Sequence, residues 1–265
     1  MIRRRLDSEL VRRHLARSRE QAQELIDAGL VRVNGVLAEK AARQVSESCS
    51  VVVVDDGPRW VSRGAHKLLG ALAEFAPAGL VVAGRRCLDA GASTGGFTQV
   101  LLTQGANSVV SVDVGYGQLD WSLQRDPRVT VMDRCNIRTL TLEQLGQPID
   151  LAVGDLSFIS LRLVLPSLVM LTTHEADVLV MVKPQFEVGK DAVGAGGVVR
   201  DPHLREAAVR GVRDAGIELG WGSCGVAASP LPGPSGNVEY FLWLRRGANE
   251  VSDAMIAHAV QGGPS

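Results

Sequence analysis

Seven short apolar runs between residues 86 and 244 constrain the fold of this chain more than any other feature. Segments with helical spacing separate most of these runs, and such alternation is typical of an α/β protein with a largely parallel sheet. The last two runs are joined only by the loop 229–236, so the sheet should end in an antiparallel hairpin. The strands that we expect are 86–89, 108–114, 129–132, 150–154, 177–183, 223–228 and 238–244.

The first 57 residues follow a different pattern. Apolar residues recur at helical spacing between Leu6 and Ala28, with a break at Arg17-Ser18, which predicts two short helices. Residues 30–36 then predict a strand, an Asn-Gly turn and a strand, and residues 51–54 add a third strand. The domains that we expect are a small α+β domain over 1–57, a linker over 58–63, an α/β domain over 64–246, and a mobile or weakly helical tail over 247–265.

Charge is distributed unevenly along the chain. The net charge is only −1, but residues 1–19 contain seven arginines and two acids. This local excess of positive charge suits a phosphate-rich partner, and it suits a solvated helix face equally well. Charge alone leaves both interpretations open.

Composition argues against several classes of protein. The longest apolar runs are far shorter than the ~18 residues of a membrane-spanning helix. Arginines and acids occupy the N-terminal segment, where a secretory signal needs an apolar stretch. The four cysteines form no CxxC pair, and the five histidines show no HxxxH or HExxH spacing. We therefore expect a cytoplasmic protein, monomeric by default, with no membrane segment and no metal.

Residues 89–97 form a glycine-rich turn, DAGASTGGF, at the end of the first strand of the α/β domain. Glycine is needed where a ligand approaches the backbone closely, and the helix that follows offers free N–H groups. Asp113 lies 24 residues after Asp89, at the end of the next strand, where an acid can bind both hydroxyls of a ribose. The combination favours a nucleoside ligand over a merely structural turn.

The same turn contains Gly91-x-Ser93-x-Gly95, which also fits the nucleophile elbow of an α/β-hydrolase. Asp155 with His174 or His203 could complete a triad in the required order. Neither histidine has a distinctive context, and a hydrolase needs neither the second glycine nor the spaced acid. A hydrolase with Ser93 as its nucleophile is therefore the alternative hypothesis.

Three charged residues stand at the ends of other apolar runs. Asp155 and Lys183 follow two of the expected strands, at the edge where open α/β sheets bind their ligands. A lysine directly after Val178–Val182 is partly desolvated, and a desolvated ammonium gives up its proton more readily. Glu239 is the only acid in the last apolar run, where a lone carboxylate is costly unless it is paired.

Residues 5–7 (RLD), 15–19 (LARSR) and 28–35 (AGLVRVNG) resemble the S4 RNA-binding fold. In that family the basic face of the two helices contacts structured RNA. The resemblance therefore favours RNA over a merely solvated surface, with phosphate and shape readout rather than base reading. The matching positions here are Arg4, Arg5, Arg17, Arg19 and Lys40.

A second resemblance is carried by four charged residues that are far apart in the chain. Lys67, Asp155, Lys183 and Glu239, together with the turn at 89–97, look like the Lys-Asp-Lys-Glu tetrad of FtsJ-like RNA ribose 2′-O-methyltransferases. With an S4 module in front, residues 3–246 resemble the TlyA, or haemolysin A-like, family. The segments that carry this resemblance are SRGAHKL, DAGASTGGF, DLSFISL, KPQFEVGK and GPSGNVEYFLWL. The family implies a Rossmann-like methyltransferase sheet behind a small S4 domain.

The resemblance also implies a reaction, namely methyl transfer from S-adenosyl-L-methionine to the ribose 2′-hydroxyl of cytidine in 16S or 23S ribosomal RNA, or in both. Such a hydroxyl is a weak nucleophile and needs both a base and exact alignment. Lys183 would be the base, Asp155 would hold it, and Lys67 and Glu239 would orient the ribose. The implied cofactor-binding residues are Asp89, Ala90, Gly91, Ser93, Thr94, Gly95, Gly96, Phe97, Asp113 at the ribose, Asn136 at the adenine, and Asp155.

Two non-enzymatic hypotheses accompany this interpretation. A haemolysin-like pore former would need a segment that inserts into membranes, and the sequence offers none of sufficient length. An RNA-binding assembly factor that had lost catalysis should show a damaged tetrad, whereas all four residues are present here. We expect ribosomal RNA or ribosomal subunits as the partner.

Overall fold

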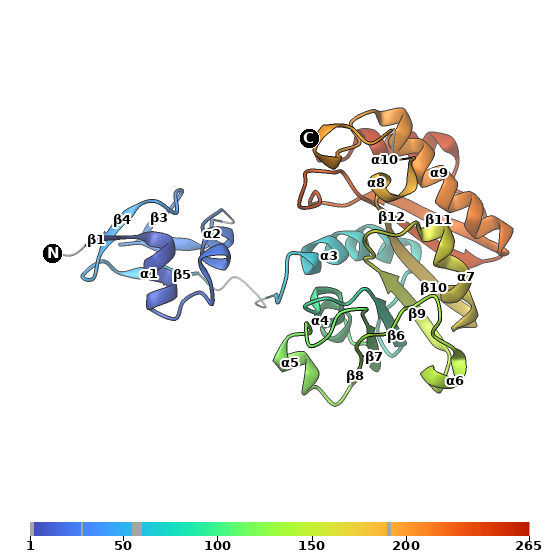
Figure 1. Ribbon diagram of the computed structural model, residues 1–265, viewed down its shortest axis with the longest axis horizontal. Coiled ribbons are helices and arrows are strands. Elements are labelled where there is room, and N and C mark those ends of the chain that lie inside the picture. Colours follow the sequence, from blue (N-terminus) through green and yellow to red (C-terminus); the bar gives the residue numbers. More distant parts are fainter. Residues whose placement is uncertain (1–2, 28, 55–59, 190–191, 265) are drawn as a thin grey trace. The chain divides into compact units, whose positions relative to one another are not determined.

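The computed structural model describes residues 3–27, 29–54, 60–189 and 192–264. The chain divides into two compact units, Met1–Arg59 and Trp60–Ser265 (Figure 1). The division falls within the linker predicted at 58–63. Residues 55–59, which include the first two residues of the predicted linker, lie outside the described residues.

The N-terminal unit is a small α+β domain. Two helices pack with two small antiparallel sheets, of order β1-β4 and β3-β2-β5, around Leu6, Leu10 and Ile26. The Asn34-Gly35 turn has positive φ at both residues, 52° and 80°, as the predicted hairpin requires. The elements are β1 (Arg3–Arg5), α1 (Leu6–Arg12), α2 (Arg19–Asp27), β2 (Val31–Val33), β3 (Val36–Leu37), β4 (Gln44–Ser46) and β5 (Val51–Val53).

The C-terminal unit is built on a seven-stranded sheet of order β11-β12-β10-β9-β6-β7-β8. β12 pairs antiparallel with β10 and β11, and the other neighbours are parallel, which confirms the predicted hairpin. The strands are β6 (Arg86–Ala90), β7 (Ser108–Val112), β8 (Val129–Met132), β9 (Ile149–Gly154), β10 (Thr172–Val182), β11 (Trp221–Ala228) and β12 (Tyr240–Arg246).

Helices cover both faces of this sheet. Alternate residues of β10 point to opposite sides: Val178 and Val180 join one apolar core with α7, α9 and α10, while Leu179 joins the other with α3 and α4. The helices are α3 (Gly64–Phe75), α4 (Gly96–Thr103), α5 (Trp121–Gln124), α6 (Leu142–Leu145), α7 (Leu165–Met170), α8 (Pro184–Glu187), α9 (Pro202–Glu218) and α10 (Asp253–Gln261), with short 3₁₀ turns η1 (Ala76–Ala78), η2 (Leu161–Leu163) and η4 (Ala195–Gly197).

The segment after Arg246, for which the sequence predicts a mobile or weakly helical tail, contains a helix that is packed on the domain. Helix α10 lies beside α9 (Figure 1) and buries Ile256 completely. Ser252 caps its first turn, and Arg213 of α9 binds Asp253 at 2.7 Å. The sequence understates this helix because its nine residues contain few repeats of the apolar face.

Among the residues that the structure describes, no helix combines the length and the apolar character needed to cross a bilayer. The same described segments contain no group of three or more histidine, cysteine or acidic side chains arranged to hold a metal ion.

Candidate active site

The register of the sheet brings three of the four tetrad residues to one edge. β10 and β12 pair with Val182 opposite Tyr240, so Lys183 and Glu239 occupy the next step of the same ladder. β9 runs parallel to β10, and Asp155 follows its last residue. Strand topology alone therefore assembles residues that are up to 84 positions apart, as 239 − 155 gives.

Lys183 is buried beside Asp155. Its ammonium Nζ lies 2.6 Å from Asp155 Oδ1, outside the angular range of a hydrogen bond, so the contact is an ion pair. Nζ also donates a hydrogen bond of 2.8 Å to Ser157 Oγ. The Lys183 side chain is 9% exposed and that of Asp155 23%, so the carboxylate keeps contact with solvent while the ammonium is enclosed. The structure therefore brings the predicted base and the predicted acid into contact.

Lys67 and Glu239 form a second buried pair. Lys67 lies in the first half of α3, and its Nζ donates to Glu239 Oε2 at 2.5 Å. Both side chains are nearly inaccessible, at 9% and 1% exposure. Gly233 makes room for the carboxylate, because a Cβ at that position would lie 2.6 Å from Glu239 Oε1. The costly lone acid expected in the last strand is thus paired.

The glycine-rich turn follows β6 and packs against the tetrad. Gly91 has φ 85°, and a Cβ there would lie 2.7 Å from the carbonyl oxygen of Asp155. Gly96 begins α4, where a Cβ would collide with Ser62 and with the backbone of Ala65. These glycines therefore permit close contacts within the protein itself, in addition to the predicted approach of a ligand.

Asp89 lies beneath the turn and is fully buried. Its Oδ2 accepts a 2.7 Å hydrogen bond from Thr98, whereas Oδ1 has no partner among the described residues. Burial raises the pKa of this carboxyl to about 7. An orphaned buried acceptor suits the amino group of an amino-acid-like ligand, and the N–H groups at the start of α4 suit its carboxylate.

Asp113 joins the turn to the loop after β7. Its Oδ2 accepts from the backbone N–H of Ser93 at 2.8 Å, and its Oδ1 accepts from Gly115 at 2.7 Å. The carboxylate is half-buried, so it is held firmly and still meets solvent. The predicted ribose-binding acid and the predicted turn are therefore in direct contact.

The remaining predicted cofactor residues differ in accessibility. Phe97 and Ala90 point into the core, with the Phe97 ring 6.1 Å from that of Phe241. Thr94 and Asn136 are exposed, and Asn136 follows β8, with its Oδ1 accepting from the backbone N–H of Arg138. Together, the unpartnered Asp89 oxygen, the Asp113 carboxylate and the start of α4 fit a nucleoside that carries an amino-acid tail, which is the chemistry of S-adenosylmethionine.

A Ser-His-Asp triad does not form around Ser93. His174 lies near the start of β10, at the opposite end of the strand from Lys183 and so at the far edge of the sheet. The carboxylate of Asp155 is engaged with Lys183. In the described part of the chain neither His174 nor His203 forms a hydrogen bond with Ser93 or Asp155, which argues against the hydrolase alternative.

Phe158, which is not among the predicted site residues, lies three residues after Asp155. Its side chain is 91% exposed, its φ is 64°, and its ring lies 5.2 Å from that of Phe186. A strained backbone that presents an aromatic ring beside a candidate active site suits stacking against an unpaired base. The sequence does contain a signal for Phe158, because an aromatic residue follows shortly after Asp155, the acid at the end of a strand.

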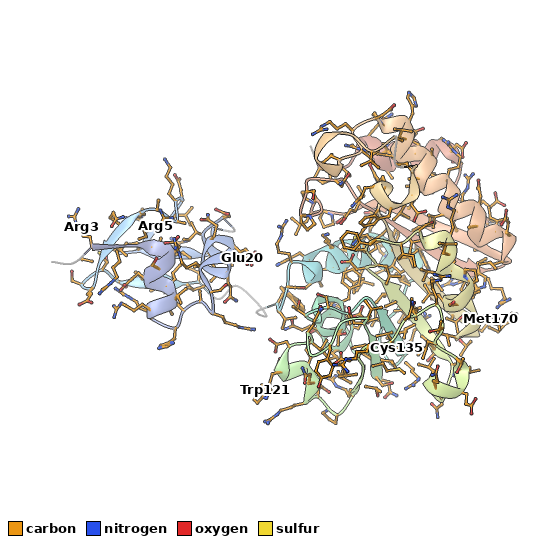
Figure 2. All side chains as sticks on the ribbon, in the orientation of Figure 1. Arg3, Arg5, Glu20, Trp121, Cys135 and Met170 are labelled. Atoms are coloured by element: carbon orange, nitrogen blue, oxygen red, sulfur yellow. The ribbon has the colours of Figure 1, made fainter. Side chains whose placement is uncertain are left out.

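In the N-terminal unit, two predicted RNA-binding arginines share one carboxylate. Asp7 binds Arg5 at 3.0 Å and Arg19 at 2.9 Å, and its side chain is only 6% exposed. Arg5 and Arg19 remain 46% and 63% exposed. Figure 2 labels Arg5 together with Arg3 on β1. The structure does not add the other predicted positions to this group: Arg4 pairs with Glu47 at 2.8 Å, and Arg17 and Lys40 are exposed.

Comparison with known proteins gives two family matches. Residues 60–246 match the FtsJ-like methyltransferase model, and residues 4–49 match the S4 domain model. The chain is 60% identical to the 16S/23S rRNA (cytidine-2′-O)-methyltransferase TlyA of Mycobacterium tuberculosis, with 98% of each chain covered. It is 36% identical to Hemolysin A of Brachyspira hyodysenteriae, covering 89% of this chain and 97% of that one. A solved structure described as a hemolysin from Streptococcus thermophilus aligns with a TM-score of 0.75 at 34% identity, covering 98% and 95%.

Proposed function

The chain belongs to the TlyA family, in which an S4 domain precedes an FtsJ-like methyltransferase domain, and on this premise we propose that it methylates the 2′-hydroxyl of cytidine in ribosomal RNA. The relative from Mycobacterium tuberculosis is named for both 16S and 23S RNA. We extend the same pair of substrates to this chain. The observation that carries the proposal is the enclosed Lys183 ammonium beside Asp155 at the ligand-binding edge of the sheet.

S-adenosylmethionine, when bound, supplies a methyl group on a positively charged sulfur. Residues at the start of the domain would hold it: the Asp113 carboxylate at the ribose hydroxyls, and the unpartnered Oδ1 of Asp89 below the amino-acid tail. Asn136, on the loop after β8, is the candidate for the adenine. The Asp155 carboxylate adds negative charge at the edge that would face the sulfonium.

Lys183 is the proposed base for the ribose hydroxyl. In the ion pair it is an ammonium, so it must lose a proton before it can accept one from substrate. Asp155 is 2.6 Å away and is the more exposed partner, so it can pass that proton to solvent. Ser157 accepts a hydrogen bond from Nζ and thereby fixes the direction of the lysine.

Lys67 and Glu239 are proposed to hold the ribose. Their pair is enclosed, so each charge is neutralised by the other before substrate arrives. A hydroxyl that enters the edge of the sheet can donate to Glu239 or accept from Lys67, which aligns the 2′-oxygen without further reorganisation. Exposed Phe158 is available to stack on the extruded base.

The S4 unit is proposed to bind the phosphate backbone of the RNA around the target. Its exposed arginines supply positive charge, and phosphate contacts of this kind position a protein without reading sequence. We propose further that the protein works with the ribosome in the cytoplasm, as a monomer and without a metal ion.

Mapping of ribose 2′-O-methylation tests the function. Ribosomal RNA is compared between cells with and without this protein, and the purified full chain is then incubated with unmodified 30S and 50S subunits and S-adenosylmethionine. We expect methylation at one or more cytidines, restored by the purified enzyme. Identical methylation maps in the two cell types, with no transfer in vitro, would contradict the proposal.

A further inference from the structure

Two segments that follow neighbouring strands contact each other along their length. Residues 155–162 follow β9, and residues 183–188 follow β10. They meet at three successive points: Lys183 with Asp155 and Ser157, Phe186 with Phe158, and Glu187 with residues 160–162. The first two points belong to the proposed site. The third has no role assigned so far.

Glu187 ends helix α8, and its side chain is only 2% exposed. Oε2 accepts from Ser160 Oγ at 2.6 Å, and Oε1 accepts from the backbone N–H of Leu161 at 2.7 Å. Arg162 Nε lies 3.5 Å from Oε2, and the Arg162 guanidinium also donates to the Glu187 carbonyl oxygen at 3.1 Å. All these partners belong to the segment that begins with Asp155.

Helix α8 transmits this anchoring to the base. It is a single turn that runs from Pro184 to Glu187, and Lys183 is its N-cap residue. Lys183 and Glu187 therefore stand at the two ends of one rigid turn. Fixing Glu187 to residues 160–162 fixes the distance between the segment that carries Lys183 and the segment that carries Asp155.

Residues 160–162 are held by packing on one side and by Glu187 on the other. Leu161 is buried in the apolar core. On the other side a cavity of about 250 Å³ lies beside the carboxylate, lined by Arg162, Glu187, Leu204 and small residues of α9 such as Ala208 and Gly211. Because space remains there, the hydrogen bonds of Glu187 fix the polar side of the segment. Burying the Glu187 carboxylate costs desolvation free energy, and the hydrogen bonds from its polar partners offset that cost.

We infer that Glu187 is a positioning residue that keeps Asp155, Ser157 and Phe158 in register with Lys183. This inference rests on the proposed function, since it concerns the same site. Glu187 does not touch the reacting atoms. It accepts hydrogen bonds and takes no part in proton transfer, so an uncharged side chain of the same shape should replace it.

The test compares Glu187→Ala with Glu187→Gln in the full chain. For Glu187→Ala we expect kcat for methyl transfer to ribosomal subunits to fall on the order of 10–100-fold, because a shift of about 1 Å at the reacting groups has effects of that size. The Kd for S-adenosylmethionine, measured by calorimetry, and the KM for the subunit should stay within about twofold of wild type. Glu187→Gln should keep kcat within about threefold of wild type, because its amide can donate to a reoriented Ser160 hydroxyl.

Asp150→Ala is the matched control. Asp150 is a half-buried carboxylate that accepts a backbone N–H from Arg86 at 3.0 Å, but it lies at the opposite edge of the sheet. Its removal should leave kcat within about twofold of wild type. A similar loss in this variant would mean that any missing carboxylate lowers activity, and it would overturn the inference.

Two further outcomes overturn the inference. Either Glu187→Ala keeps wild-type kcat, or Glu187→Gln loses as much activity as Glu187→Ala, which would make the charge itself essential. If Glu187→Ala does not fold, Ser160→Ala decides: a fall in kcat of threefold or more supports positioning, and an unchanged kcat overturns it. Wild-type enzyme with no activity on either subunit would instead refute the proposed function.

Discussion

One ion pair in each unit shows a contrast, because the two pairs expose opposite members. In the S4 unit the acid is covered and the base faces solvent: Asp7 is 6% exposed, whereas Arg19 is 63% exposed. In the catalytic unit the base is the covered partner: Lys183 is 9% exposed, whereas Asp155 is 23% exposed. The covered acid orders outward-facing cations in the S4 unit, whereas the covered base of the catalytic unit is kept away from water until substrate arrives.

This difference separates binding from chemistry. Ordered, exposed guanidinium groups can track phosphates, and their contribution is screened by salt. Enclosed pairs are screened far less, and their low-dielectric surroundings strengthen their effect on a reacting group. Substitutions in the two units should therefore change different measured quantities.

The largest effect is expected from Lys183→Ala. Loss of the base should reduce methyl transfer to ribosomal RNA by at least ~10³-fold, while the affinity for S-adenosylmethionine stays near the wild-type value. Single-turnover assays and calorimetry on the same preparation measure both quantities. A rate of methyl transfer within tenfold of wild type would show that Lys183 is not the base. The proposed contrast between a binding unit and a catalytic unit would then lose its main support.

Glu239→Ala should mainly affect stability. It leaves the Lys67 ammonium buried without its partner, and breaking such a pair costs about 3–5 kcal/mol. Urea unfolding followed by tryptophan fluorescence measures the loss. Replacing both residues, as Lys67→Met with Glu239→Leu, should recover most of the stability but no activity. If Glu239→Ala had the same free energy of unfolding as wild type, the pair of Lys67 and Glu239 would not be enclosed in solution.

Arg5→Ala combined with Arg19→Ala should weaken RNA binding moderately. Removing two phosphate contacts should lower affinity roughly tenfold in low salt and reduce the slope of log K against log salt by about two. Filter binding at several salt concentrations gives both values. The matched control is Arg128→Ala, which removes an exposed arginine of the catalytic unit that is paired with Asp126. Equal losses of RNA affinity in the double variant and in Arg128→Ala would contradict a specific role for Arg5 and Arg19, the two arginines that bind Asp7.

The smallest effect is expected from pH, as a change in the melting temperature Tm. Each kcal/mol of lost stability lowers Tm by roughly 2–4 °C. Arg12 and Arg13 hold the pKa of Glu9 down at about 2, so the S4 unit keeps this stabilisation above the ordinary glutamate pKa and loses it as pH falls from there toward 2. Burial raises the pKa of Asp89 to about 7, so the catalytic unit is most stable below the ordinary aspartate pKa and loses stability as pH rises through 7.

Thermal unfolding of wild type and Asp89→Asn checks this contrast. Between pH 5 and pH 8 the melting temperature of the catalytic unit should fall in the wild type and change less in the variant. Glu9→Gln should reduce the acid sensitivity of the S4 unit only, and the remainder should persist because Arg5 and Arg19 also lower the pKa of Asp7. Parallel pH profiles for wild type and Asp89→Asn would show that Asp89 does not titrate in this range.

The sequence predicted the sheet well because buried parallel strands are continuous apolar runs, and a charged residue at the end of such a run is easy to see. It could not predict β1, because Arg3–Arg5 has no apolar alternation and forms a strand only by pairing with β4. The burial of Asp89 and the contacts of Glu187 depend on residues that are distant in sequence. These tertiary contacts leave no local pattern.

Strand β11 forms one border of the large sheet, and the returning chain runs along it. Gly222 has no side chain where Ala248 passes, and the backbone N–H of Val251 donates to Ser223 Oγ at 2.8 Å. The protein's own C-terminal segment therefore packs against this border strand, and such cover keeps edge strands from pairing with other molecules. Truncation before Ala248 would uncover this border, and the shortened protein should self-associate into aggregates even though every residue of the tetrad would remain.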